Sequence, residues 1–92
     1  MDTTTRARTA VVIPAYEPGA ELVRSTRELV GAGFTVVVVD DGSGPSYGEV
    51  ISQLDPGIHL LTHARNRGKG AALETGYRYV QAEIGPCTVV TA

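Results

Sequence analysis

Two adjacent carboxylates follow a run of four valines in the stretch VVVVDDGSG, residues 36–44. A carboxylate accepts hydrogen bonds, so it can hold a ribose hydroxyl, the ring N–H of a nucleobase or a cation. The alternative is an ordinary turn, in which both side chains bond nearby backbone N–H groups and one of them caps the next helix. Taken alone, DDGS favours the turn, and Asp41 fits it well. Asp40 lies closer to the strand and is the better candidate for binding a ligand.

A second group of candidates lies in the stretch HARNRGKGAALETGY, where three basic residues fall within five positions. Gly68 and Gly70 permit unusual backbone angles just before a predicted helix, and the N–H groups at a helix N-terminus attract anions. Arg65 and Lys69 add full positive charges, which suits a diphosphate. The alternative is a helix-entry loop with Asn66 as its cap and a solvated basic face. This stretch alone supports the two interpretations equally.

Two familiar phosphate-binding motifs are absent. A dinucleotide fold needs GxGxxG directly after its first strand, but IPAYEPG has Pro14 and Tyr16 where the pyrophosphate must approach bare backbone. A P-loop needs GxxxxGK followed by Ser or Thr. Here Gly70 follows Lys69, and His63 stands where the first glycine belongs. The sequence therefore excludes both kinds of site.

Length and charge limit the classes of protein that these groups can serve. The chain has 92 residues, which is enough for one small domain. A net charge of −2 gives no electrostatic footprint for a nucleic-acid partner. The single cysteine, Cys87, suits a reducing compartment. No apolar run approaches the roughly 20 residues that span a bilayer, and the N-terminal MDTTTRARTA lacks the apolar region of a signal peptide. We therefore expect a soluble, cytoplasmic chain.

The hydrophobic pattern alternates between buried strands and amphipathic helices. Continuous apolar runs rich in β-branched residues predict strands of a parallel sheet, because both faces of such a sheet are covered. Apolar residues at helical spacing between glycine and proline stop signals predict helices. The expected strands are TAVVIP, FTVVVVD, GIHLLTH and CTVVTA, and the expected helices lie in PGAELVRSTRELVGAG, PSYGEVISQLDPG and GKGAALETGYRYVQAEIG.

This order predicts a three-layer, Rossmann-like α/β half-domain with the element order βαβαβαβ. Right-handed crossovers place the strands of its parallel four-stranded sheet in the order 3-2-1-4. The domain is expected to cover residues 9–92 after a flexible N-terminus at residues 1–8. Ligands of open α/β sheets bind outside the carboxyl ends of the strands, where the strand order reverses. PAYEPG and DDGSG both leave the sheet at this edge, so the two acids lie at the rim of the expected crevice.

The three stretches together are more specific than any one of them. VVIPAYE, then VVVVDDGSG, then RNRGKGAALETGY strongly resemble the N-terminal half of family 2 glycosyltransferases of the GT-A fold. The resemblance runs from about Thr9 to Ala92 and implies a truncated GT-A fold. RNRGKGAAL looks most like the branch that transfers a sugar from a nucleotide to a polyprenyl phosphate, such as dolichol-phosphate mannosyl- and glucosyltransferases.

The resemblance also implies a binding site for a UDP- or GDP-sugar. In it, the PAYE segment lines the base and ribose pocket, Asp40 accepts the ring N–H of a uracil or guanine, and the basic loop lies near the base or diphosphate. The family's commonest first motif reads PAYN followed by Glu, so Glu17 stands in the Asn position and its role is open. The site residues implied are Pro14, Ala15, Tyr16, Glu17, Asp40, Asp41, Arg65, Gly68 and Lys69.

Two parts of the family's chemistry have no candidate in these residues. In the family, a DxD motif after strand four holds the Mg²⁺ or Mn²⁺ that bridges the donor diphosphate, and a later carboxylate deprotonates the acceptor. The chain stops at VVTA, where the DxD would begin. We therefore assign no catalytic residue and no metal ligand here, expect the metal ligands mostly outside this chain, and expect the 92 residues alone to be inactive.

Several alternatives stay open on the sequence. The chain is either the nucleotide-binding part of a glycosyltransferase or a non-catalytic nucleotide-binding or interaction module, as in a remnant or pseudoenzyme. The acceptor stays open: the resemblance offers a polyprenyl phosphate as one candidate, and with it a parent protein associated with the cytoplasmic face of a membrane. The fourth strand is expected to leave an unpaired edge, through which copies of the chain would form a homo-oligomer.

Overall fold

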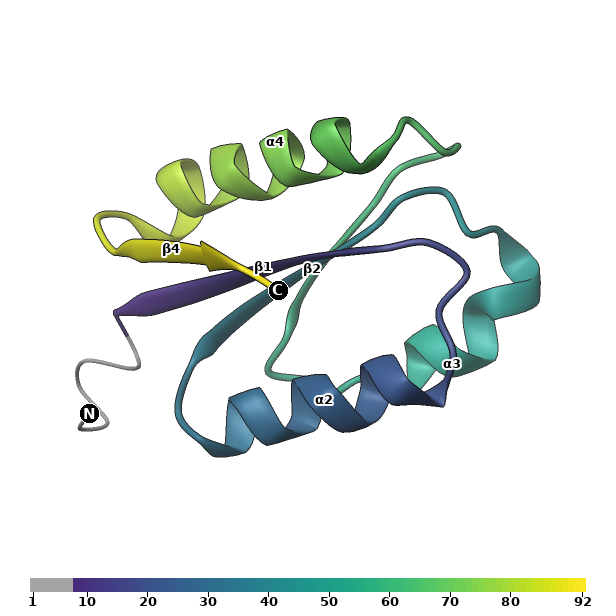
Figure 1. Cartoon of the computed structure of the whole chain (residues 1–92), viewed down its shortest axis with the longest axis horizontal. Helices are drawn as coiled ribbons and strands as arrows, with labels where there is room; N and C mark the ends of the chain where they lie inside the picture. The colour runs from purple at the N-terminus through teal and green to yellow at the C-terminus, as the bar shows by residue number, and fades with distance from the viewer. Residues whose placement is uncertain (1–7) are drawn as a thin grey trace.

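A computed structural model of the chain describes residues 8–92 and shows one four-stranded parallel sheet (Figure 1). The strands stand in the order β3-β2-β1-β4, which confirms the predicted topology and fold class. Residues 1–7 of the predicted flexible N-terminus lie outside the described residues. The strands are β1 (Thr9–Ala15), β2 (Thr35–Asp40), β3 (His59–Thr62) and β4 (Thr88–Thr91).

Helices cover both faces of this sheet. Helix α4 lies on one side, and α2 and α3 lie on the other (Figure 1). A 3₁₀ turn, η1, leads into α3, and α4 continues into a π-helical turn, η2. The bounds are α2 (Ala20–Gly31), η1 (Pro45–Tyr47), α3 (Gly48–Ser52), α4 (Lys69–Tyr79) and η2 (Val80–Ile84).

The helix expected in PSYGEVISQLDPG is much shorter than its sequence pattern. Only η1 and the five residues of α3 are helical. The segment then turns, with the Asp55 carboxylate accepting a hydrogen bond of 2.7 Å from the Gly57 N–H. An aspartate that bonds the backbone two residues ahead stabilises a turn in competition with helix. That local bond and Pro56, which disfavours helical angles at Asp55, together favour the turn over a longer helix.

Strand alternation divides the core into two clusters. Side chains of successive strand residues point to opposite faces, so each strand contributes to both clusters. The cluster beneath α4 contains Ala10, Val12, Val37, Val39, Ala72 and Val80. The cluster facing α2 and α3 contains Val11, Ile13, Ala15, Val36 and Val38. The same alternation decides which loop residues reach each face at the strand ends.

Helix α4 packs very close to the sheet because two small residues, Ala72 and Gly76, are buried in its contact face. A Cβ atom at Gly76 would overlap the Cγ1 atom of Val12. The absence of a side chain at Gly76 is therefore what permits this close approach. It brings the start of α4 to the carboxyl end of β1, beside the point where the strand order reverses.

Strand β4 forms one edge of the sheet, and all four of its residues are exposed. Val89 and Val90 add apolar surface there. Self-association through this edge stays a prediction. Within residues 8–92, no helix has the length and apolar character needed to cross a membrane.

Candidate functional site

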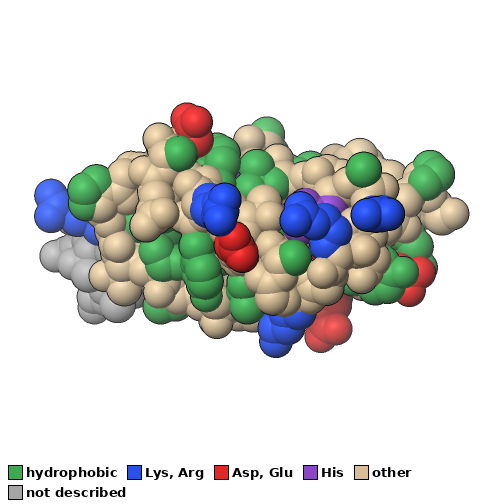
Figure 2. Space-filling model, turned by 90° about the horizontal axis from the view of Figure 1, so that it is seen from above, with side chains coloured by type: hydrophobic (Ala, Val, Ile, Leu, Met, Phe, Trp, Pro, Cys, Tyr) green, Lys and Arg blue, Asp and Glu red, His purple; other side chains and the backbone are tan. Residues whose placement is uncertain are grey.

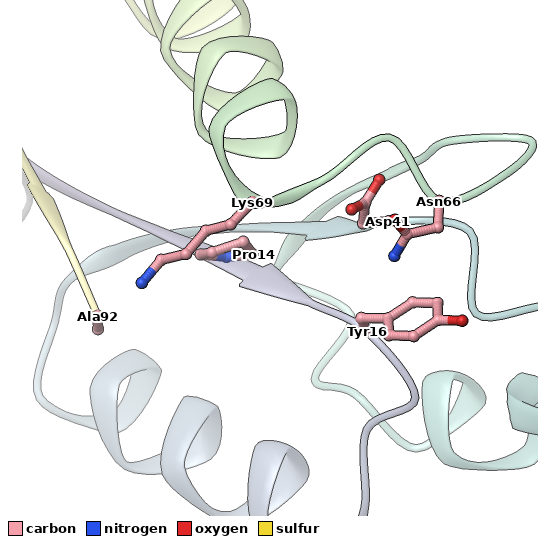
Figure 3. A pocket seen from close by; sticks show the side chains of 6 residues that line it. All are labelled: Pro14, Tyr16, Asp41, Asn66, Lys69 and Ala92. Atoms are coloured by element: carbon pink, nitrogen blue, oxygen red, sulfur yellow. The ribbon is translucent and has the colours of Figure 1, made fainter.

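A pocket opens at the carboxyl ends of β1 and β2, beside the first turn of α4 (Figure 3). Its volume of about 310 Å³ lies at the lower end of the range for small-molecule sites, roughly 300–1,000 Å³. The location is the one predicted from the strand order. The lining residues are Pro14, Tyr16, Asp41, Asn66, Lys69 and Ala92.

Strand alternation explains which of the predicted site residues line the pocket. Pro14 and Tyr16 continue the face of β1 that carries Val12, and this face looks toward α4. Ala15 points to the opposite face and packs in the core beneath α2 and α3. Asp41 is the next residue after Val39 on the α4 face of β2. Of the predicted site, four residues therefore line the pocket together, namely Pro14, Tyr16, Asp41 and Lys69.

Asp41 is bonded on both carboxylate oxygens and is only 3% exposed. Its Oδ1 accepts hydrogen bonds from His63 Nδ1 at 2.7 Å and from the Arg67 backbone N–H at 2.9 Å. Its Oδ2 accepts one from the Gly68 N–H at 2.9 Å. These donors lie 22 to 27 residues further along the chain. Asp41 is therefore more than a local turn residue, because it binds the loop that leads into α4.

The hydrogen bond from His63 is the main cause that lowers the pKa of Asp41 below its ordinary value of 3.8. The Arg67 and Gly68 N–H groups and the charge of His63 lower the pKa of this carboxyl further, and burial opposes them. Hydrogen bonds to an ionised carboxylate favour its charged form. Asp41 is thus a carboxylate at neutral pH and acts as an internal anion for the loop.

His63 continues the hydrogen-bond chain from Asp41 into α4. Its ring is buried, and Nε2 lies 2.8 Å from the Thr75 hydroxyl oxygen. From the sequence, His63 served only to exclude a P-loop, so this role was missed. The missed signal was strand register: Asp40 pairs with Thr62 at the ends of β2 and β3, so the residues that follow, Asp41 and His63, stand side by side.

Asp40 makes the local turn that the sequence offered as the alternative role for both acids. Its Oδ1 accepts a hydrogen bond of 3.1 Å from the Ser43 N–H, and its side chain is buried. The Ser43 hydroxyl in turn accepts a bond of 2.8 Å from the Glu17 N–H. The loops after β1 and β2 are tied together through Ser43.

Glu17 has an exposed side chain and a backbone φ of 50°. This left-handed conformation is unfavourable for most residues, whereas Asn and Gly adopt it more readily. The departure at Glu17 from the family's commonest motif therefore has a backbone consequence. The side chain does not line the pocket.

The loop before α4 reaches the pocket through Asn66. The cap position of α4 is Gly68, with φ 95° and no side-chain cap bond, so the interpretation of Asn66 as cap is wrong. Arg65 is exposed and does not line the pocket. Gly42 lies directly against the backbone at Arg65 and Asn66, where an added Cβ would overlap. The loop is thus fixed by close packing as well as by hydrogen bonds.

Lys69 supplies positive charge to the pocket from the first position of α4. Figure 3 shows its amine reaching past Pro14 toward Ala92, while the Asp41 carboxylate points toward the loop before α4. Figure 2 shows further basic side chains along this face, with a histidine partly visible between them. A lysine and a helix N-terminus together favour an anionic ligand. Tyr16, 52% exposed, adds an aromatic wall.

The described residues do not form a cation site. Across residues 8–92, no three His, Cys, Asp or Glu side chains come together as metal ligands. The Asp41 oxygens are taken by N–H donors. Asp40 and Asp41 also bond in different directions, to the Ser43 N–H and to the loop before α4 respectively. The pair therefore does not fit a divalent ion between them.

Fold and pocket define a parallel α/β domain that holds its ligand outside the carboxyl ends of the strands, where the strand order reverses. The model of the family Glycosyl transferase family 2 matches residues 10–90. The chain belongs to this family, as the three sequence stretches had indicated.

The relatives that this chain resembles include enzymes whose names contain a lipid phosphate. An undecaprenyl-phosphate 4-deoxy-4-formamido-L-arabinose transferase of Enterobacter sp. (strain 638) is 32% identical, over 84% of this chain and 27% of its own. Two dolichyl-phosphate beta-glucosyltransferases of Trichomonas vaginalis are 31% and 33% identical, over 83% and 82% of this chain and 27% and 28% of their own. The chain spans about a quarter of the length of these relatives.

Proposed function

We propose that this chain is the nucleotide-sugar-binding portion of a family 2 glycosyltransferase that transfers a sugar from a UDP- or GDP-sugar to a polyprenyl phosphate. The observation that carries the proposal is the pocket at the ends of β1 and β2, which combines an aromatic wall, a lysine and the start of α4. Complete catalysis is proposed to need Mg²⁺ or Mn²⁺, with ligands mostly outside these residues.

Each side of the pocket suits a different part of a nucleotide diphosphate. The exposed ring of Tyr16 offers a face for a nucleobase. The Lys69 ammonium and the N-terminal N–H groups of α4 suit the diphosphate, whose charge grows as the sugar leaves. Asp40 does not line the pocket. It stays the proposed acceptor for a ring N–H because it precedes the lining residue Asp41 in the chain and keeps lone pairs beyond the one that accepts the Ser43 N–H.

The proposed acceptor class comes from the relatives, whose names contain undecaprenyl phosphate and dolichyl phosphate. In such a transfer, an oxygen of the acceptor phosphate forms a bond to the anomeric carbon. The bond from that carbon to the nucleotide diphosphate breaks, and the diphosphate leaves with the bonding electrons. An acceptor that is already a phosphate anion has less need of a general base than a hydroxyl.

Titration with UDP and GDP, followed by backbone amide shifts, tests the pocket. Perturbations are expected at residues 14–17, 40–43 and 65–70, with larger effects from the diphosphates than from uridine or guanosine. Lys69→Ala should weaken binding about tenfold, because it removes a charge-assisted contact. Arg78→Ala is the matched control, since Arg78 lies on the same helix and pairs with Glu74. Shifts confined to other regions would refute the site.

A second test concerns activity of the 92 residues alone. Release of free nucleotide from UDP-glucose and GDP-mannose is measured with Mn²⁺, in the presence and absence of polyprenyl phosphate. No turnover is expected, because acceleration needs groups that bind the transition state more strongly than the ground state. Turnover abolished by Asp40→Ala would contradict the assignment of no catalytic residue here.

A further inference from the structure

A closed set of hydrogen bonds joins both ends of the loop formed by residues 63–68. At the first residue, the His63 ring bonds Asp41, and its backbone N–H bonds the Asp40 carbonyl at 2.8 Å. At the last residues, the Arg67 and Gly68 N–H groups bond the same Asp41 carboxylate. One buried carboxylate therefore closes the loop.

Thr75 extends this set of bonds into α4. The Asp41 oxygens carry no hydrogen, so His63 Nδ1 is the donor in the 2.7 Å bond. Nε2 bonds the Thr75 hydroxyl across 2.8 Å, accepting its O–H when the ring is neutral and donating an N–H to its oxygen when the ring is charged. The hydroxyl thereby holds the ring in the orientation that bonds Asp41. Neither His63 nor Thr75 lines the pocket, so both can affect a bound ligand only through other residues.

The loop that these bonds fix carries pocket residues. Asn66 lies near its tip and Lys69 follows its last residue, and both line the pocket. Gly42 packs directly against the backbone of this loop at residues 65–66. A change in the bonds of Asp41 must therefore move the wall of the pocket that suits a diphosphate.

We propose that His63 and Thr75 are positioning residues, which act through Asp41 to place Asn66 and Lys69 for binding the diphosphate of the nucleotide. The inference rests on the proposed function. It assigns a ligand-binding consequence to two buried side chains that do not touch the ligand.

Thr75→Val separates positioning from general stability, because it removes a hydroxyl while nearly keeping the shape. Its matched control is Thr26→Val on α2, across the sheet, where a fully buried hydroxyl bonds the carbonyls of Leu22 and Val23. Both variants are expected to lower the melting temperature. Only Thr75→Val should weaken UDP or GDP binding, by about fivefold. Thr75→Ser, which restores the hydroxyl, should recover the affinity.

Two substitutions of His63 separate its two bonds. An asparagine amide lies near the position of Nδ1 and can still bond Asp41, whereas a glutamine amide reaches the position of Nε2 and bonds only Thr75. His63→Gln is expected to weaken binding about tenfold and His63→Asn less. His63→Gln should also speed hydrogen exchange at the Arg67 and Gly68 amides. The control is His59→Gln, because His59 lies on β3, four residues before His63, and bonds the Tyr79 hydroxyl of α4 instead of Asp41.

The outcomes distinguish the inference from the proposed function. If the wild-type chain binds neither UDP nor GDP, the proposed function fails and the inference falls with it. If the wild type binds and Thr75→Val and His63→Gln bind as well as their controls, only the inference is overturned. Should His63→Gln fail to fold, the comparison of Thr75→Val with Thr26→Val decides alone.

Discussion

The pocket has two walls that are held in very different ways. The loop of residues 63–68 is bonded to Asp41 at both ends and packed against Gly42. The segment after β1 is tied by the Glu17 N–H to Ser43, carries the exposed ring of Tyr16 and includes a residue in a left-handed conformation. The wall that suits charge is therefore held by more bonds and closer packing than the wall that suits a base.

Removing the carboxylate of Asp41 should have the largest effect, because it supports the wall that has more bonds. Asp41→Ala leaves the His63 ring and two backbone N–H groups without their acceptor. We expect the melting temperature to fall by about 10 °C and nucleotide binding to fall below detection. Asp55→Ala is the control, since its carboxylate bonds only its own turn through the Gly57 N–H. Equal losses in the two variants would contradict the difference between the walls.

Gly42→Ala tests the packing of the same wall. The new Cβ would overlap the backbone at Arg65 and Asn66, and Gly42 has a φ of 74°. We expect a loss of about 2–3 kcal/mol in the free energy of unfolding. Gly44→Ala carries backbone strain alone, because φ 88° and ψ 175° lie in a region essentially confined to glycine while an added Cβ meets no atom within 4 Å. Its loss should be the smaller of the two, at about 1–2 kcal/mol. Urea denaturation measures both, and losses of equal size would show that the overlap is relieved without effect.

Acid should weaken the same wall through Asp41. Its pKa in the folded chain is lowered from 3.8, chiefly by the His63 hydrogen bond, so the folded state binds this proton less tightly than the unfolded state. The carboxylate therefore stabilises the fold above about pH 4, and this contribution is lost as the pH falls through the lowered pKa. Asp41→Asn has no such titration. Its deficit in stability relative to the wild type should shrink between pH 4 and pH 2.5, and a constant deficit would argue against this assignment.

The smallest expected effect is a gain in stability, on the wall that has fewer bonds. Glu17→Asn places a residue that tolerates the left-handed conformation where φ is 50°. We expect about 0.5–1 kcal/mol of added stability by urea denaturation. Glu17→Ala keeps the unfavourable conformation and removes the carboxylate, so it should give no gain. A gain of equal size in both variants would trace the effect to the charge of Glu17 instead.

Most of the fold could be predicted from the sequence because it depends on local patterns. Four short β-branched runs and the right-handed crossover rule were sufficient for the order β3-β2-β1-β4. The helix in PSYGEVISQLDPG was overestimated, since its apolar spacing gave no sign that the Asp55 turn would end it early. A single side-chain hydrogen bond to the backbone can favour a turn over a helix, and the spacing of apolar residues carries no sign of such a bond.

The candidate site was predictable in location but less so in detail. The alternation of strand faces, applied past the strand ends, separates Asp41 from Asp40 and Tyr16 from Ala15. The sequence pattern allows Asn66 as a helix cap and contains no sign of the bonds that join His63 and Thr75 to Asp41. Their roles depend on the register of β2 with β3 and on the depth of α4. Both are properties of tertiary packing, so no local stretch contains them.

The missing side chain at Gly76 also affects where α4 points. Asp41 holds the residues just before the helix, and the contact of Gly76 with Val12 sets the height of the helix above the sheet. Two fixed points determine the direction of a rigid rod, and residues 69–76 separate them by about 10 Å of axis. A methyl group that lifted the second point by about 1 Å would turn the rod by about 6°. The direction in which α4 points at the pocket thus depends on Gly76, two turns from the start of the helix, which has a hydrogen atom where other residues have a Cβ.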